Sequence, residues 1–151
     1  MANNGWFKNI VVAFDGSKDS ERAVQVACSV SAKYGSKVTV VHVYHSPSMV
    51  FAPGPGMPVP DSPALEQAAE ETGGGVLTRG VEIASRAGVK AKGELIEGPS
   101  AVEAIVTFAS QQKIDLIVLG TRGMTGFKKL VLGSVSTGVV SHAKCPVLVV
   151  R

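Results

Sequence analysis

The chain has 151 residues, of which 45% are hydrophobic, and this is enough for one domain, 1–151, with a core of its own. The formal net charge of +3 suits an anionic ligand but is too small and too dispersed for a nucleic-acid-binding protein. No apolar run is long enough to span a membrane, and the first residues carry no apolar signal segment. With only two cysteines we expect a cytoplasmic protein without disulfides.

The first third of the chain predicts a strand, a helix and a second strand. The apolar run 10–14 ends in the turn Asp15-Gly16-Ser17, where Ser17 suits the N-cap of a helix. Apolar residues then recur at helical spacing until Gly35, a typical helix end. The following run, 38–44, is rich in β-branched residues and predicts the second strand.

The middle of the chain begins with a segment rich in proline and glycine, 46–62, which we expect to be a surface loop. Ser62 and Pro63 can begin the next helix, whose apolar positions continue to residue 87. Three consecutive glycines, 73–75, interrupt this face, and each costs roughly 1 kcal/mol relative to alanine inside a helix. The sequence leaves open whether this helix continues, bends or breaks there.

The last third continues the alternation of strands and helices. We expect a short strand within 89–97, a helix beginning at the capping box Ser100 to Glu103, a strand at 114–119, a helix at 135–143 and a last strand at 147–150. Alternating strands and helices predict an α/β fold, a doubly wound parallel sheet with helices on both faces.

A glycine-rich loop follows the strand at 114–119. Its glycines, Gly120, Gly123 and Gly133, and then Ser134, follow the pattern G-x2-G-x9-G-S. A strand, a glycine loop and a helix start together form a common phosphate site, because backbone N–H groups can approach the phosphate oxygens there. The pattern is neither the P-loop nor the dinucleotide fingerprint, since neither spacing occurs at the required place in the chain.

This pattern resembles the nucleotide-binding motif of the universal stress protein family, in its ATP-binding branch. The segments IVVAFDGS, VVHVY and CPVLVV resemble the first, second and last strands of the same family, so the resemblance covers nearly the whole chain. It implies a five-stranded, Rossmann-like sheet with strand order 3-2-1-4-5. The first and fourth strands are then neighbours, and the site is expected at their carboxyl ends.

The resemblance also implies which residues contact ATP, alone or with Mg²⁺. Asp15 matches a ribose-binding aspartate, and the backbone of Val43 matches the group that meets adenine. Ala13 and Phe14 are expected to line the same pocket, although Phe14 suits the core equally well. The residues assigned to the nucleotide site are Ala13, Asp15, Val43, Gly120, Thr121, Arg122, Gly123, Gly126, Gly133, Ser134, Val135 and Ser136. The competing interpretations are an ordinary turn at Asp15, a core position at Val43 and a glycine-rich surface turn at the motif.

The expected function is therefore an ATP-binding sensor or regulator of the stress response. The sequence shows no constellation for nucleophilic catalysis and no metal site among His42, His45 and His142, so we expect at most slow ATP hydrolysis. Two alternatives remain open: an interaction module that does not depend on ATP, and an adenine-nucleotide hydrolase of a related fold.

The last strand also predicts an association. The run 147–150 is apolar and lies at the sheet edge in the implied order, so a homodimer through this strand is expected. The alternative is an edge shielded by Trp6 and Phe7.

Overall fold

The computed structural model describes residues 5–50, 54–58, 62–121 and 132–151. Its five strands form one parallel sheet in the order β3-β2-β1-β4-β5, which confirms the predicted strand order and fold class. The strands are β1 (Asn9–Ala13), β2 (Lys37–Tyr44), β3 (Lys92–Glu97), β4 (Leu116–Gly120) and β5 (Val147–Val150). The helices are α1 (Lys18–Tyr34), α2 (Pro47–Val50), α3 (Pro63–Arg86), α4 (Ala101–Gln111) and α5 (Ser134–His142).

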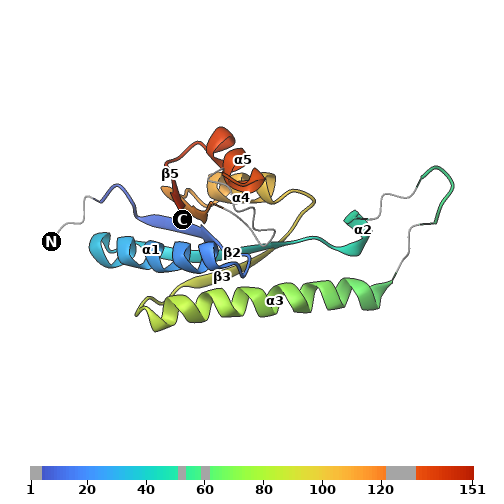
Figure 1. Ribbon diagram of the computed structural model, residues 1–151, viewed down its shortest axis with the longest axis horizontal. Helices are drawn as coiled ribbons and strands as arrows, with labels where there is room; N and C mark the ends of the chain where they lie inside the picture. The colour runs from blue at the N-terminus through green and yellow to red at the C-terminus, as the bar shows by residue number, and fades with distance from the viewer. Residues whose placement is uncertain (1–4, 51–53, 59–61, 122–131) are drawn as a thin grey trace.

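Helices cover both faces of the sheet, with α1 and α3 on one side and α4 and α5 on the other (Figure 1). Successive residues of β1 point to opposite faces, and all three central ones are fully buried. Ile10 and Val12 pack with the α1 and α3 layer, whereas Val11 packs with the α4 and α5 layer. The continuous apolar runs seen in the sequence are therefore strands buried on both faces.

Three helices begin at serine N-caps whose side chains accept a backbone hydrogen bond. Ser17 caps α1, Ser62 caps α3 and Ser100 caps α4, and each serine accepts from the N–H three residues further on. Helix α5 differs, because its N-cap is Gly133 and no side chain caps it. Within the described residues, the first N–H groups of α5 are therefore without a capping side chain.

Helix α3 runs without a break through its three consecutive glycines, which settles the question that the sequence left open. Two glycines of this helix face the sheet. A Cβ on Gly73 would lie 3.2 Å from side-chain atoms of Tyr44 and Leu95, and one on Gly80 would lie 2.8 Å from the Phe14 ring. These glycines thus let α3 approach the sheet closely, while the start of the helix extends past the sheet (Figure 1).

The segment predicted as an irregular surface loop, 46–62, contains one short helix. Pro47 begins α2, a position that proline favours because its fixed φ suits a first helical turn. The side chain of Glu66 accepts a hydrogen bond of 2.9 Å from the N–H of Ser48 and so connects α2 to α3. In the described parts of the chain, no helix combines the length and apolar character needed to cross a membrane.

Candidate functional site

The winding of the sheet reverses between two neighbouring strands, β1 and β4. Their register pairs Ile10 with Leu116 and Val12 with Val118, so both strands end at the same edge of the sheet. The chain leaves β1 for α1 on one face, and it leaves β4 for α5 on the other. A crevice therefore opens at the carboxyl ends of these strands, which is where open α/β sheets bind ligands.

A cavity of about 190 Å³ lies at this point. The structure brings nine of the twelve predicted site residues to it: Ala13, Asp15, Val43, Gly120, Thr121, Gly133, Ser134, Val135 and Ser136. Phe14 lines it as well. The other three predicted residues, Arg122, Gly123 and Gly126, lie outside the described residues.

Six lining residues were not predicted: Ser20, Val41, His42, Ala101, Ile105 and Leu119. For some of them, the spacing of residues in the sequence already indicated a place at the cavity. Val41 lies two positions from Val43 and shares its sheet face, while Ala101 and Ile105 are one helical turn apart on α4. Only the three-dimensional packing, however, shows that α4 closes this side of the cavity.

The start of α5 is fixed to the end of β4 by hydrogen bonds around Thr121. Its carbonyl accepts from the N–H of Gly133 at 2.6 Å and from the hydroxyl of Ser136 at 3.0 Å. Ser136 is 2% exposed, so its hydroxyl serves this connection. The hydroxyl of Thr121 is likewise used, since it donates to the Asp19 carboxylate at 2.8 Å. The two hydroxyls thus hold the loop ends, and within the described residues no acceptor is found for the first N–H groups of α5, whose residues border the cavity.

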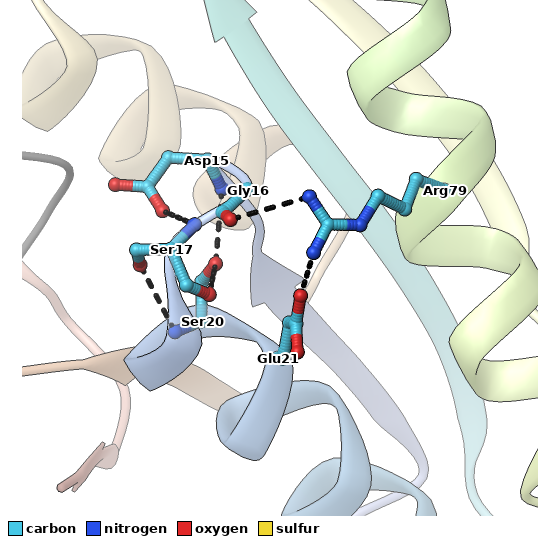
Figure 2. Close-up of polar contacts among 6 residues, drawn as sticks. All are labelled: Asp15, Gly16, Ser17, Ser20, Glu21 and Arg79. Atoms are coloured by element: carbon cyan, nitrogen blue, oxygen red, sulfur yellow. Dashed lines mark hydrogen bonds and ion pairs between the residues drawn. The ribbon is translucent and has the colours of Figure 1, made fainter.

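Asp15 lies in a tight turn at the end of β1 (Figure 2). One of its carboxylate oxygens, Oδ1, accepts from the N–H of Ser17 at 2.9 Å, and its own N–H donates to Ser20 Oγ at 3.4 Å. Gly16 has a φ of +86°, which a side chain would make strained. Asp15 therefore makes hydrogen bonds within a turn, and the same residue also borders the cavity.

The side chains of His42 and His142 hydrogen-bond to backbone carbonyls, and the two free cysteines are buried or half-buried. Nδ1 of His42 lies 2.8 Å from the Phe14 carbonyl, and Nδ1 of His142 lies 2.8 Å from the Gly138 carbonyl. Because a carbonyl only accepts, each of these nitrogens carries the proton. Burial raises the pKa of the Cys28 thiol and, together with Asp115, that of Cys145, so neither cysteine is an activated nucleophile.

Residues 7–151 match the universal stress protein family over nearly the whole chain. The chain belongs to this family. A universal stress protein of Methanocaldococcus jannaschii is 36% identical over 146 residues, covering 96% of this chain and 82% of the relative. One from Thermus aquaticus is 37% identical over 152 residues, covering 96% of this chain and 99% of the relative.

Solved structures of the family have the same fold. A universal stress protein in complex with cAMP superposes with a TM-score of 0.73 at 27% identity, covering 97% of this chain and 99% of the other. One from Archaeoglobus fulgidus in complex with dAMP gives a TM-score of 0.68 at 25% identity, covering 97% of this chain and 100% of the other. Two relatives of similar fold thus carry adenine nucleotides.

Proposed function

We propose that this universal stress protein binds an adenine nucleotide, with ATP as the preferred ligand, and acts as a nucleotide-dependent sensor or regulator in the stress response. The observation that carries the proposal is the cavity between β1 and β4, bordered by the uncapped start of α5. The complexes of related proteins with cAMP and dAMP support the adenine part of the assignment.

The cavity divides into chemically distinct parts that match a nucleotide. Val41, Val43 and Ile105 give an apolar wall for a flat base. Asp15 offers a carboxylate that can accept hydrogen bonds from ribose hydroxyls. The N–H groups at the start of α5 point positive partial charge toward phosphate oxygens, and Mg²⁺ can accompany the phosphates.

The size of the cavity fits this division. Its volume of about 190 Å³ is smaller than the pocket that encloses a whole drug-sized ligand, roughly 300–1,000 Å³. The base and sugar therefore occupy the cavity itself, and the phosphates lie along the start of α5. A chain of three phosphates uses these donors and the continuing glycine motif more fully than a cyclic monophosphate does, which favours ATP over cAMP.

Binding is better supported than turnover. Two of the hydroxyls at the cavity, those of Thr121 and Ser136, donate to Asp19 and to backbone carbonyls, which leaves them poorly placed as nucleophiles. We expect any ATP hydrolysis to be slower than about 1 per second, the lower end of ordinary enzyme rates. This expectation separates a nucleotide-binding regulator from a hydrolase of a related fold.

Calorimetric titration of the purified protein with ATP, ADP, cAMP and GTP tests the proposal. ATP should bind more tightly than cAMP, and GTP should bind weakly because its base presents different edge groups to the Val43 backbone. The absence of both heat and thermal shift at millimolar ATP, in a well-folded protein, would favour the interaction module that does not depend on ATP.

Association through β5 is a further part of the proposal. This strand pairs with β4 on one side, and Leu148 at its centre is 36% exposed. Trp6 is 87% exposed and Phe7 packs against the ring of Tyr34, which argues against a shield formed by these two residues. In a homodimer, the backbone N–H and C=O groups at the outer edge of β5 would pair with those of a second copy of the chain. The cytoplasmic location remains a prediction from the sequence.

A further inference from the structure

The side chain of Arg79 extends from helix α3 to the turn that joins β1 to α1 (Figure 2). Its Nη1 donates to the carbonyl of Gly16 at 3.4 Å, and its Nη2 pairs with the carboxylate of Glu21 in the first turn of α1. Its guanidinium carbon lies 6.0 Å from the centre of the Phe14 ring. One side chain therefore contacts three successive parts of the β1 to α1 junction.

The hydrogen bond from Arg79 to Gly16 is long-range in the sequence, whereas the hydrogen bonds of Asp15 in this turn are local. The bonds of Asp15 to Ser17 and Ser20 join residues two to five positions apart, so the turn makes them by itself. Arg79 lies 63 residues from Gly16 and acts on the turn from outside. Gly16 is in the left-handed region, which glycine adopts without strain, and the hydrogen bond from Arg79 adds a restraint on its carbonyl from outside the turn.

The orientation of this peptide matters because Asp15 precedes it directly. The Gly16 carbonyl and the Ser17 N–H belong to one planar peptide group, and that N–H donates to Oδ1 of Asp15. A hydrogen bond that fixes the Gly16 carbonyl therefore also fixes the Ser17 N–H of the same peptide. This N–H in turn restrains Oδ1 of Asp15. Among the described residues the other oxygen, Oδ2, accepts no hydrogen bond, and Asp15 borders the cavity.

We propose that Arg79 is a positioning residue for the nucleotide site, acting through the Gly16–Ser17 peptide on the carboxylate of Asp15. The inference rests on the proposed function, since it assigns Arg79 to the ribose side of that site. It also connects α3 to the proposed nucleotide site, because Arg79 belongs to this helix.

The exposure of this residue separates a positioning role from a role in stability. The side chains of Arg79 and Glu21 are 55% and 30% exposed, and ion pairs with this access to water contribute little to folding. Arg79→Ala should therefore melt close to the wild type. Its affinity for ATP should fall about threefold to tenfold, the effect of loosening one hydrogen-bonded ligand group.

The test compares four variants by calorimetry with ATP and with inorganic triphosphate, which has phosphates but no ribose. Arg79→Ala should weaken ATP and leave triphosphate unchanged, and Arg79→Lys should recover part of the loss. Glu21→Gln removes the ion pair but keeps the Gly16 contact, so it should bind ATP as the wild type does. Arg86→Ala is the matched control, because Arg86 is exposed in the last turn of the same helix.

Hydrogen exchange of the Ser17 amide in the ligand-free protein gives a second, independent readout. Exchange should be faster in Arg79→Ala than in the wild type and unchanged in Arg86→Ala. If wild-type protein binds no ATP, the proposed function fails, and this readout still decides whether Arg79 positions the turn. Unchanged exchange in Arg79→Ala, wild-type ATP affinity in that variant, or an equal loss for ATP and triphosphate would each overturn the inference.

Discussion

Gly120 lies against the backbone of Asp19, so closely that an ideal Cβ on the glycine would be 2.8 Å from the Cβ of Asp19 and 2.9 Å from its carbonyl carbon. The first turn of α1 thus passes over the end of β4 with no room for a side chain between them. The first glycine of the motif has a packing reason of its own, in addition to any contact with phosphate. The hydroxyl of Thr121, which donates to Asp19, strengthens the same contact.

Replacing Gly120 by alanine should therefore destabilise the fold. A Cβ this close to backbone atoms must displace the start of α1, and overpacking of this kind costs about 1–3 kcal/mol. Urea denaturation measures the change. Gly74→Ala is the control, since a Cβ there meets nothing within 4 Å and alanine favours a helix by up to about 1 kcal/mol. A Gly120→Ala protein as stable as the wild type would contradict the packing argument.

The sequence predicts the elements of this fold well because their signals are local. Ser17, Gly35 and Ser100 mark helix ends by side-chain and backbone chemistry within one turn, and the structure places all three where expected. The course of α3 through its glycines could not be predicted, because it depends on distant neighbours. Of the three glycines, Gly73 packs against Tyr44 and Leu95, neither of which is near it in the sequence.

For the candidate site, too, the features that depend on neighbouring residues could be predicted, and those that depend on residues far away in the sequence could not. The glycine spacing and the strand ends bring most predicted residues to one cavity, because parallel strands end at a common edge. The hydrogen-bond partner of a polar side chain, however, can lie far away in the sequence. Thr121 donates to a carboxylate 102 positions away, so the hydroxyl of a residue that the sequence assigns to the nucleotide site helps to hold the fold.

Asp15 makes a hydrogen bond within the turn and borders the cavity, and two substitutions separate its part in the turn from its proposed contact with ribose. Asp15→Asn keeps an oxygen for the Ser17 N–H but loses the charge, whereas Asp15→Ala loses both. If the carboxylate binds ribose, both variants should weaken ATP, Asp15→Ala by about tenfold or more, and neither should change the binding of inorganic triphosphate. Calorimetry with both ligands makes the comparison. Unchanged ATP affinity in Asp15→Ala would leave Asp15 with the turn alone.

The proposed dimer can be tested at Leu148, the exposed centre of β5. Val149, its neighbour, packs on the α4 and α5 layer, so a charge there would disturb the core as well as the edge. Leu148→Lys places the charge on the exposed side and should dissociate the dimer with little loss of stability. Light scattering at tens of micromolar protein, roughly where a standard-size interface holds, measures the mass. A monomeric wild type would exclude the dimer.

The last prediction concerns Gly133, the N-cap of α5. Its φ of −64° and ψ of 166° lie in the extended region, which every residue adopts without strain. Positive φ is therefore not the reason for a glycine here, although the sequence motif alone permits that explanation. We expect the reason to be space for a ligand, because Gly133 borders the cavity directly before the N–H groups of α5.

Gly133→Asp should separate folding from binding. An aspartate at an N-cap accepts hydrogen bonds from the N–H groups of its own helix, so the variant should be at least as stable as the wild type. The same carboxylate occupies the donors proposed for phosphate and repels its charge, so ATP binding should be lost. Gly133→Val should also lose ATP by filling the space, and Ser134→Ala should weaken it about tenfold or more by removing one hydroxyl. Thermal melts and calorimetry measure both quantities. If Gly133→Asp binds ATP like the wild type while Asp15→Ala does not, the phosphates do not lie at the start of α5.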